Sequence, residues 1–399
     1  MIDAHQAPRG RKSRIQEQCH RAAHSVQSIR TLSRISILCL WFVSIGFALP
    51  AATAQEMRPG SGSQRNPWRI EVFGSLSYDS NILRLSDADV QEFVDGVGWD
   101  RYHISTYDDL MVTLGMRCRY QARLMGTRMT RAGVRYRQHH YSNNPIIDRE
   151  NLLVWGEQEV LRGHRLRLGY YYVPHYYIRH LPDVDISSSS DVSRYRAFDF
   201  SSDYYYGEWR MDRRWKIAAK AALGWRSEDY NADFGEYDTD VLLWDIDASL
   251  AAARWFTVEG GYRFENADAQ GYDNEGETRS TSDDVDASFE RDSYWGGLRI
   301  DLDDLVQIPL AMSCLLEYRK KTFTSDKGVD EDPFHFERVD RDRQLDLELV
   351  WGVNRSFELS GRYGFAAREV DSPMRDLIVE EKDYTKGVFE LGFAYVLVP

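Results

Sequence analysis

The segment Glu390-Leu391-Gly392-Phe393-Ala394-Tyr395-Val396-Leu397 lies two residues before the end of the chain, and its pattern decides the fold class. Large apolar side chains occupy every second position from residue 389 to residue 397, and small or polar side chains stand between them. A period of two places alternate side chains on opposite faces of a β-strand, whereas a helix would need a spacing of three and four. The segment therefore predicts a strand with one apolar face.

The same alternation recurs along the chain after residue 67. Near residue 347, for example, Leu345, Leu347, Leu349 and Trp351 alternate with Gln344, Asp346 and Glu348. An even number of strands, fourteen, is predicted in this way, at residues 68–78, 106–120, 128–140, 150–161, 165–177, 197–209, 215–228, 239–251, 256–266, 284–300, 308–323, 340–352, 357–368 and 384–397.

Short and long connections alternate between these strands. The short ones begin at residues 121, 162, 210, 252, 301 and 353, and the long ones at residues 79, 141, 178, 229, 267, 324 and 369. Outer-membrane barrels combine short periplasmic turns with long extracellular loops. We therefore predict an all-β fold, a transmembrane antiparallel up-and-down β-barrel of about 14 strands. Its first and last strands should pair, because an open sheet edge in lipid would leave backbone groups without hydrogen bonds.

A soluble β-sandwich would also show alternation, so the tryptophans help to decide. In the barrel topology they fall at strand ends on the periplasmic side, as an interfacial aromatic girdle requires. A sandwich, moreover, would bury its apolar face and leave no interior for the charged residues to line. The tryptophans concerned are Trp68, Trp209, Trp215, Trp255 and Trp351.

An apolar run from Ile35 to Ala48 follows two arginines and precedes Ala52-Thr53-Ala54. This order is typical of a secretory signal peptide with cleavage before Gln55, and the run is too short for a membrane-spanning helix. The predicted organisation is a signal peptide with a long basic region (residues 1–54), a flexible periplasmic leader (55–67) and an outer-membrane barrel (68–399). Both ends of the barrel should then lie in the periplasm of a Gram-negative bacterium.

Charge and cysteine content narrow the function further. The signal segment holds seven of the 50 basic and two of the 63 acidic residues, which leaves 43 basic and 61 acidic and a net charge of −18. Such an acidic protein is not expected to bind nucleic acid. Mean hydropathy of −0.54 excludes a bundle of membrane helices but not a barrel with a polar interior. Cys118 and Cys314 lie on strands that are not neighbours, so we expect both thiols to remain reduced.

Residues out of phase with the apolar face should line the interior. Early strands supply arginines and later strands supply carboxylates, so opposite walls could carry opposite charge and select polar solutes. Equally, the charges could meet across a narrow interior and neutralise one another. The predicted pore-lining residues are Arg117, Arg119, Arg131, Arg135, Arg137, Arg165, Arg167, Asp245, Asp247, Glu259, Asp346 and Glu348.

Histidines near the extracellular rim are candidate metal ligands or catalytic groups. The candidates are His139, His140, His175 and His180, with Asp183 and Asp185 nearby in sequence. A strand separates the two pairs, and the chain holds no His-Glu-x-x-His spacing. We expect no catalytic residue, no metal and no cofactor, and the protein is not expected to be an enzyme.

The last strand resembles the C-terminal β-signal that the barrel assembly machinery recognises, through Glu390, Gly392, Tyr395 and Leu397. Val398 and Pro399 follow it, where most such signals stop at an aromatic residue. Tyr78-Asp79-Ser80-Asn81 resembles the opening of the β-barrel porins linked to exopolysaccharide gene clusters, and is similar to the start of the barrel of surface lipoprotein assembly modifiers. The modifiers carry a helical domain before the barrel, for which residues 55–67 leave no room.

The leading hypothesis is a hydrophilic outer-membrane pore for diffusion or export of polar solutes, with saccharides as candidates. The alternatives are a plugged barrel whose long loops bind a partner or assist surface-protein assembly, and a hydrolase active at the rim. The expected partners are outer-membrane lipid, lipopolysaccharide and the assembly machinery, and the sequence leaves the solute open.

Overall fold

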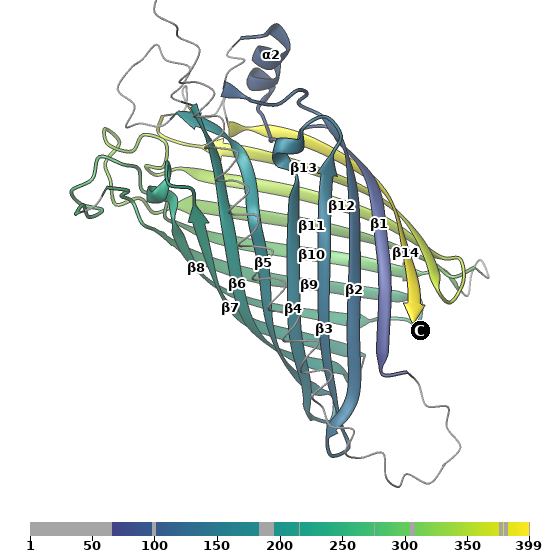
Figure 1. Cartoon of the computed structure of the whole chain (residues 1–399). Coiled ribbons are helices and arrows are strands. Elements are labelled where there is room, and N and C mark those ends of the chain that lie inside the picture. Colours follow the sequence, from purple (N-terminus) through teal and green to yellow (C-terminus); the bar gives the residue numbers. More distant parts are fainter. Residues whose placement is uncertain are drawn as a thin grey trace, which may run out of the picture. The chain divides into compact units, whose positions relative to one another are not determined.

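A computed structural model describes residues 66–97, 101–182, 195–214, 216–274, 276–303, 308–374, 378 and 382–398 (Figure 1). The described chain folds as one closed barrel of antiparallel strands. The strands are β1 (Trp68–Asp79), β2 (Asp109–Met125), β3 (Arg128–Tyr141), β4 (Arg149–Leu161), β5 (His164–Pro182), β6 (Tyr195–Arg214), β7 (Ile217–Tyr230), β8 (Thr239–Ala251), β9 (Phe256–Ala269), β10 (Phe289–Asp301), β11 (Leu310–Phe323), β12 (Val339–Gly352), β13 (Phe357–Asp371) and β14 (Tyr384–Val398).

Each strand pairs with its neighbours in sequence, and β1 pairs with β14 to close the sheet. The pairing runs from Ile70 opposite Val398 to Asp79 opposite Val388, with one irregularity after Ile70. Both the start of β1 and the end of β14 therefore lie at the rim that carries the short turns. The predicted barrel, its strand number and its closing pair are confirmed.

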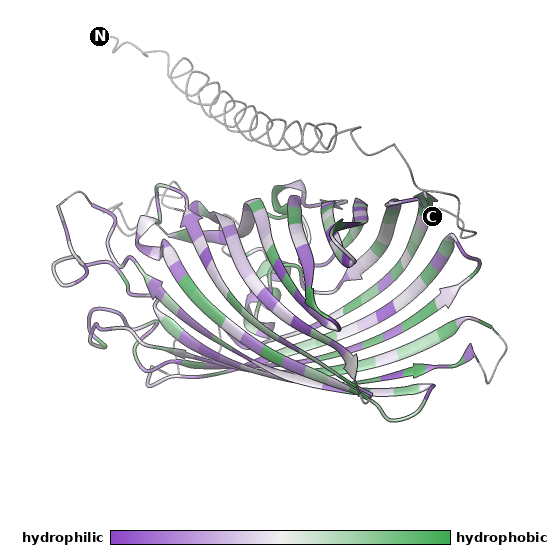
Figure 2. Ribbon diagram, turned by 90° about the horizontal axis from the view of Figure 1, so that it is seen from below, coloured by the Kyte–Doolittle hydropathy of each residue, from purple (hydrophilic) through white to green (hydrophobic). Residues whose placement is uncertain are grey.

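The outer face of the barrel is apolar and exposed, as lipid contact requires. On β2 the side chains of Leu110, Val112, Leu114 and Met116 are exposed, while Thr113 between them is buried. Hydrophobic and hydrophilic residues alternate along most strands (Figure 2). An outward apolar band with a polar interior is the signature of a transmembrane barrel. Within the described part of the chain, no helix is long and apolar enough to span a membrane.

Tryptophans mark the short-turn rim of this band. Trp68, Trp255 and Trp351 are exposed at or beside strand ends, as the girdle argument expects. Trp209 is exposed too, but it lies within β6, which continues to Arg214 and not only to residue 209 as predicted. Trp215, the fifth tryptophan of that prediction, lies outside the described residues, as does nearly all of the predicted signal peptide and leader. Cys118 on β2 and Cys314 on β11 are both free thiols, as predicted.

The long connections hold structure that strand alternation could not predict. The first contains the helix α2 (Asp87–Asp95), which begins at the N-cap Ser86 and ends at Gly96 in a left-handed conformation (φ 71°). Short 3-10 turns, η2 (Pro145–Ile147) and η4 (Gly235–Tyr237), shape two others. Predicted strand starts at residues 106 and 284 were too early, because strands β2 and β10 begin only at Asp109 and Phe289.

Glycines inside the barrel let aromatic rings lie flat against a neighbouring strand. A Cβ atom on Gly115 would lie 2.3 Å from the Phe73 ring, so only glycine leaves room for that ring. The same relation joins Gly133 to Trp155, Gly169 to Tyr206 and Gly261 to Trp295. We call each such glycine position a notch. Each notch lets a large ring lie close to the interior wall, so that the ring does not narrow the barrel.

Candidate functional site: the barrel interior

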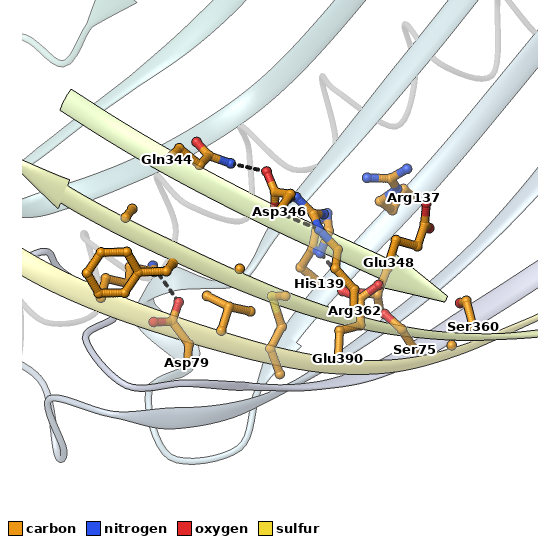
Figure 3. Close-up of a pocket in the computed structure, with 18 of the residues that line it drawn as sticks. Ser75, Asp79, Arg137, His139, Gln344, Asp346, Glu348, Ser360, Arg362 and Glu390 are labelled. Atoms are coloured by element: carbon orange, nitrogen blue, oxygen red, sulfur yellow. Dashed lines mark hydrogen bonds and ion pairs between the residues drawn. The ribbon is translucent and has the colours of Figure 1, made fainter. Parts of the chain in front are cut away.

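A cavity of about 650 Å³ lies inside the barrel against strands β1–β5 and β11–β14. Its lining is rich in charged and polar side chains, and the first long connection contributes Ile82 and Arg84. Figure 3 shows labelled residues from several strands around this space. The alternation of the strands explains the lining, because residues out of phase with the lipid-facing side chains all point inward.

The basic wall of the cavity consists of Arg117 on β2, Arg137 on β3 and Arg149, the first residue of β4. Arg117 and Arg137 lie over the Phe73 ring, with guanidinium carbons 5.5 and 5.6 Å from its centroid. Arg149 lies over the Tyr176 ring at 5.2 Å. Cations over aromatic faces are attracted by the ring quadrupole, so these rings hold the three guanidinium groups in place.

The acidic wall consists of Glu348 on β12, Glu358 on β13 and Glu390 on β14. Ser77 donates a hydrogen bond of 2.9 Å to Glu390. In the described chain these three carboxylates form no ion pair. The basic residues that β11–β14 add to the lining are each paired with a carboxylate: Arg319, Arg343, Arg362 and Lys386. The unpaired charges of the two walls are therefore cations on β3 and β4 and anions on β12–β14.

Asp346 also lines the cavity, between the two kinds of charge. It accepts hydrogen bonds from Arg362 at 2.6 Å and from Gln344 at 2.6 Å, so its charge is neutralised locally. His139 lies beside the basic wall, with its Nδ1 atom 3.0 Å from Thr113 Oγ1. That contact occupies one ring nitrogen and leaves the other available to the cavity.

Of the predicted pore-lining residues, Arg117, Arg137, Asp346 and Glu348 line this cavity. Many of the others form local ion pairs instead, as Asp247 does with Lys220 at 2.6 Å and Asp245 with Arg263 at 3.0 Å. Arg117 both lines the cavity and pairs with Glu71 at 2.6 Å. By contrast Arg119, Arg135, Arg137, Glu259 and Glu348 form no ion pair with any described residue. From the sequence, the interior charges could either remain separated on different walls or neutralise one another. The structure contains both unpaired charges and local ion pairs.

Glu157 on β4 gathers three of the predicted arginines around one buried carboxylate. Arg131, Arg165 and Arg167 approach it to 2.7, 3.0 and 2.7 Å, and its side chain is 0% exposed. Trp155, in the Gly133 notch, supports Arg167 at 4.3 Å from the ring centroid. This cluster lies outside the cavity and is structural.

Part of the interior is packed and dry. Val241, Leu243, Ala267, Phe289 and Phe323 form a buried apolar cluster on strands β8–β11. Lys321 lies over the Phe289 and Phe323 rings at 3.8 and 4.0 Å. The water-accessible space therefore does not fill the whole cross-section of the barrel.

Two long connections, residues 270–288 and 324–338, are joined by a buried polar network. Asp332 accepts hydrogen bonds from the backbone of Asp286, from Ser325 and from His335 Nδ1 at 2.9 Å. Lys327 donates to the backbone oxygens of Ser282 and Asp284. Burial lowers the pKa of His335, while hydrogen bonds from its partners hold the pKa of Asp332 below its usual value against the effect of burial.

The rim histidines are engaged within the fold. His180 Nδ1 lies 2.7 Å from the Tyr177 hydroxyl, and its ring stacks on His103 with centroids 3.7 Å apart. His175 lies 3.7 Å from Asp199, and His140 lies 3.0 Å from Asp148. Asp183 and Asp185 lie outside the described residues, so the rim-hydrolase alternative gains no assembled site from the described part.

The described residues that come nearest to a metal-ligating set are Asp273, Glu277 and Asp284 in the loop after β9. One ligand oxygen from each lies within 4.8 Å of the others. Carboxylate oxygens suit hard divalent cations such as Ca²⁺. Asp284, however, already accepts hydrogen bonds from Ser282 and from the backbone of Asp273.

The residues of the predicted assembly signal divide between the two faces of β14. Glu390 and Gly392 face the cavity. Tyr395 and Leu397 are exposed on the lipid-facing side. A Cβ atom on Gly392 would lie 2.6 Å from Ser360 Oγ, so a larger residue there would require the Ser360 hydroxyl to move. Recognition by the assembly machinery stays a prediction.

Several residues of the interior were missed from sequence. Arg149 belongs to the basic wall, and Phe73 and Tyr176 are the rings over which its arginines lie. Glu71 and Glu157 are ion-pair partners of the predicted arginines. Strand phase could have found Glu71, Phe73 and Glu157, because each is out of phase with the apolar face. Nothing in the sequence marks the stacking of arginines on rings, which depends on the register between strands.

A closed barrel with an apolar outer band and a charged interior cavity is a transmembrane barrel of the porin-like class. No protein-family model matches the sequence, and no curated protein matches it either. Similar solved structures include the anion-selective porin from Comamonas acidovorans, at 9% identity, covering 83% of this chain and 98% of that chain with a TM-score of 0.41.

A bacterial polysaccharide outer membrane secretin is also similar, at 7% identity, with 83% and 98% of the two chains covered and a TM-score of 0.42. The outer membrane protein opdK from Pseudomonas aeruginosa follows at 11% identity, with 82% and 99% covered and a TM-score of 0.37. Similarities this low carry no information on the solute, so function has to be inferred from the cavity.

Proposed function

We propose that this protein forms a hydrophilic pore in the outer membrane of a Gram-negative bacterium, for the diffusion or export of polar solutes. The observation that carries the proposal is the interior cavity of about 650 Å³ with its charged lining. A barrel interior of this size without a path would be expected to fill with apolar side chains, as it does around Phe289 and Phe323. A charged lining instead keeps water in the path and selects among polar solutes.

Saccharides are the solutes we favour. Hydroxyl groups bond well to carboxylates and guanidinium groups, both of which border the cavity, and aromatic rings lie beside them. The resemblance of Tyr78-Asp79-Ser80-Asn81 to exopolysaccharide-linked porins points to the same class. In the membrane we place the short turns and both ends of the barrel on the periplasmic side. The outer face of the barrel then contacts membrane lipid and lipopolysaccharide.

Liposome swelling tests the pore directly. Purified protein is inserted into liposomes, which are diluted into solutions of neutral sugars of graded size, from a pentose to a trisaccharide. A pore gives swelling rates that fall as the sugar grows. Equal rates with protein-free liposomes for every sugar would exclude the pore. Heat-modifiable migration on a gel confirms that the inserted protein is folded.

A plugged barrel with binding loops is the second candidate, and one observation favours it. The packed cluster of Val241, Leu243 and Phe289 already closes part of the interior, and the network around Asp332 holds two long connections in a fixed arrangement. Rigid loops suit the binding of a partner at the cell surface. Absence of swelling for all sugars would favour this function.

A further inference from the structure

We propose that Arg137 and Arg149 form a binding site for the carboxylate of an acidic saccharide inside the barrel. The inference rests on the proposed pore, because the ligand must reach the cavity. Arg117 and Phe73 are assigned as positioning residues of the same site.

The two arginines are cations in the cavity without an anionic partner. Neither forms an ion pair within the described part of the chain, whereas Arg117, beside them, is paired with Glu71. The register places His139 opposite Arg149 and Asn151 opposite Arg137, so the arginines are diagonal neighbours on the same interior face. Like charges this close destabilise each other, and a bound anion would relieve that repulsion.

The repulsion is increased by the neighbouring strand. Arg117 lies directly opposite Arg135, and Gly115 lies opposite Arg137. Arg135 likewise forms no ion pair with a described residue, and the Nε atoms of Arg135 and Arg137 are buried without a hydrogen-bond partner. Four arginines thus share one patch of wall with Glu71 as the carboxylate partner of one of them.

The aromatic rings give the arginines an orientation suited to a planar anion. Arg137 lies over Phe73 and Arg149 over Tyr176, at 5.6 and 5.2 Å from the ring centroids. A guanidinium group held over a ring presents its fork of N–H donors from a fixed position. Such a fork matches the two oxygens of a carboxylate, and stacking reduces the entropy lost on binding.

The opposite side of the cavity distinguishes a sugar acid from a simple anion. Glu348, Glu358 and Glu390 accept hydrogen bonds but repel negative charge. A ligand with one carboxylate and several hydroxyl groups satisfies both sides, since its hydroxyls donate to these carboxylates while its own carboxylate bonds to the arginines. Chloride or sulfate would gain the arginine contacts and bring nothing to offset repulsion from the acidic wall.

Binding to the purified protein in detergent tests the site without requiring transport. Equilibrium dialysis with labelled galacturonate, and with galactose as the neutral analogue, measures affinity for each. We expect wild-type protein to bind galacturonate at least tenfold more tightly than galactose. Arg137→Gln and Arg149→Gln should each weaken galacturonate binding by about tenfold or more, because each removes a charge-assisted contact.

Arg263→Gln is the matched control. Arg263 faces the interior on β9, pairs with Asp245 and does not line the cavity, so it removes the same charge at another place. It should leave galacturonate affinity unchanged. Equal losses in Arg263→Gln and Arg137→Gln would show that net charge, and not a site, attracts the ligand, which overturns the proposal.

Gly115→Ala tests the positioning of Phe73 without changing any charge. The added methyl group would lie 2.3 Å from the present ring position, so the ring and the arginines above it must move. We expect weaker galacturonate binding and unchanged galactose binding. Phe73→Leu alone, which removes the ring beneath Arg117 and Arg137, should weaken galacturonate binding in the same way, and unchanged galacturonate affinity in both variants would remove Phe73 from the site.

The carboxylate-binding site and the open pore are tested by independent outcomes. Equal affinity for galacturonate and galactose in folded wild-type protein overturns the carboxylate site, whatever the swelling assay shows. Specific galacturonate binding with no swelling keeps the site and removes the pore. A galacturonate affinity that survives both arginine substitutions assigns the carboxylate to other residues and also overturns the inference.

Discussion

Ser77 donates a hydrogen bond of 2.9 Å from its hydroxyl group to the carboxylate of Glu390, and so joins the first strand of the barrel to the last. The two residues are opposite each other in the pairing of β1 with β14. Ser77 is fully buried. The bond lies at the seam where the barrel closes, and it involves the polar residue of the predicted assembly signal.

Substitution at this seam should weaken the barrel. Glu390→Ala leaves the buried Ser77 hydroxyl without its acceptor, which we expect to cost about 1–3 kcal/mol of unfolding free energy. Urea unfolding in detergent micelles measures the change. In a double-mutant cycle with Ser77→Ala, the combined loss should be smaller than the sum of the single losses. Additive losses would show that the bond contributes nothing.

The buried carboxylate of Glu157 should contribute far more to the free energy of unfolding than an exposed carboxylate does. Glu157→Gln leaves Arg131, Arg165 and Arg167 around a neutral side chain, and removal of one partner from a buried ion-pair cluster typically costs about 3–5 kcal/mol. Glu369→Gln is the control, since Glu369 and Arg343 are 56% and 61% exposed and such pairs contribute roughly 0–1 kcal/mol. Similar unfolding midpoints for Glu157→Gln and Glu369→Gln would show that the Glu157 cluster stabilises the barrel no more than an exposed ion pair does.

Acid should loosen the network between the connections 270–288 and 324–338. Burial lowers the pKa of His335 below the ordinary histidine value of about 6.5, so the unfolded loop binds a proton more readily than the folded loop. The loop therefore loses stability as the pH falls below that value. The pKa of Asp332 is also lowered, which adds a further loss at more acidic pH. Both groups therefore act in the same direction.

Amide hydrogen exchange in residues 324–338 measures this effect, after correction for the intrinsic pH dependence of exchange. Protection should fall between pH 7.5 and pH 5 in the wild type. His335→Gln should remove most of the change in that range, while exchange in strand β4 stays constant in both proteins. Constant protection of the wild-type loop would contradict the buried neutral histidine.

Charge reversal at Arg137 of the basic wall and at the nearby Arg135 should change ion selectivity if current flows through the cavity. Replacing Arg135 and Arg137 with glutamate turns two unpaired cations into anions beside the path, so the reversal potential in a salt gradient should shift toward cation selectivity. Arg263→Glu, away from the cavity, is the control and should shift it much less. An unchanged potential in the double variant would place the current elsewhere.

Sequence alone predicted the architecture because strand phase is a local property. The alternation from Leu345 to Trp351 identifies the lipid-facing side of β12 without any tertiary information, and the alternation of short and long connections supplies the topology. The start of β10 was misplaced because Asp286 and Ser288 bond to each other in a loop, although their spacing resembles a strand.

The candidate site could be predicted only in part. Phase predicted that Arg117 and Arg137 point inward, but not that Arg117 meets Glu71 while Arg137 meets no carboxylate among the described residues. That difference depends on the stagger between β1, β2 and β3, which sequence does not specify. The helix α2 was missed for a similar reason, since its nine residues lie in a long connection without strand alternation.

Single-channel recording in planar lipid bilayers tests the central claim that the cavity is part of an open aqueous path. Folded wild-type protein should give discrete, reproducible conductance steps in 1 M KCl (roughly the salt at which surface charge is screened within about 3 Å). Heat-denatured protein should give none. Repeated insertion of folded, heat-modifiable protein without any conductance step would contradict the pore.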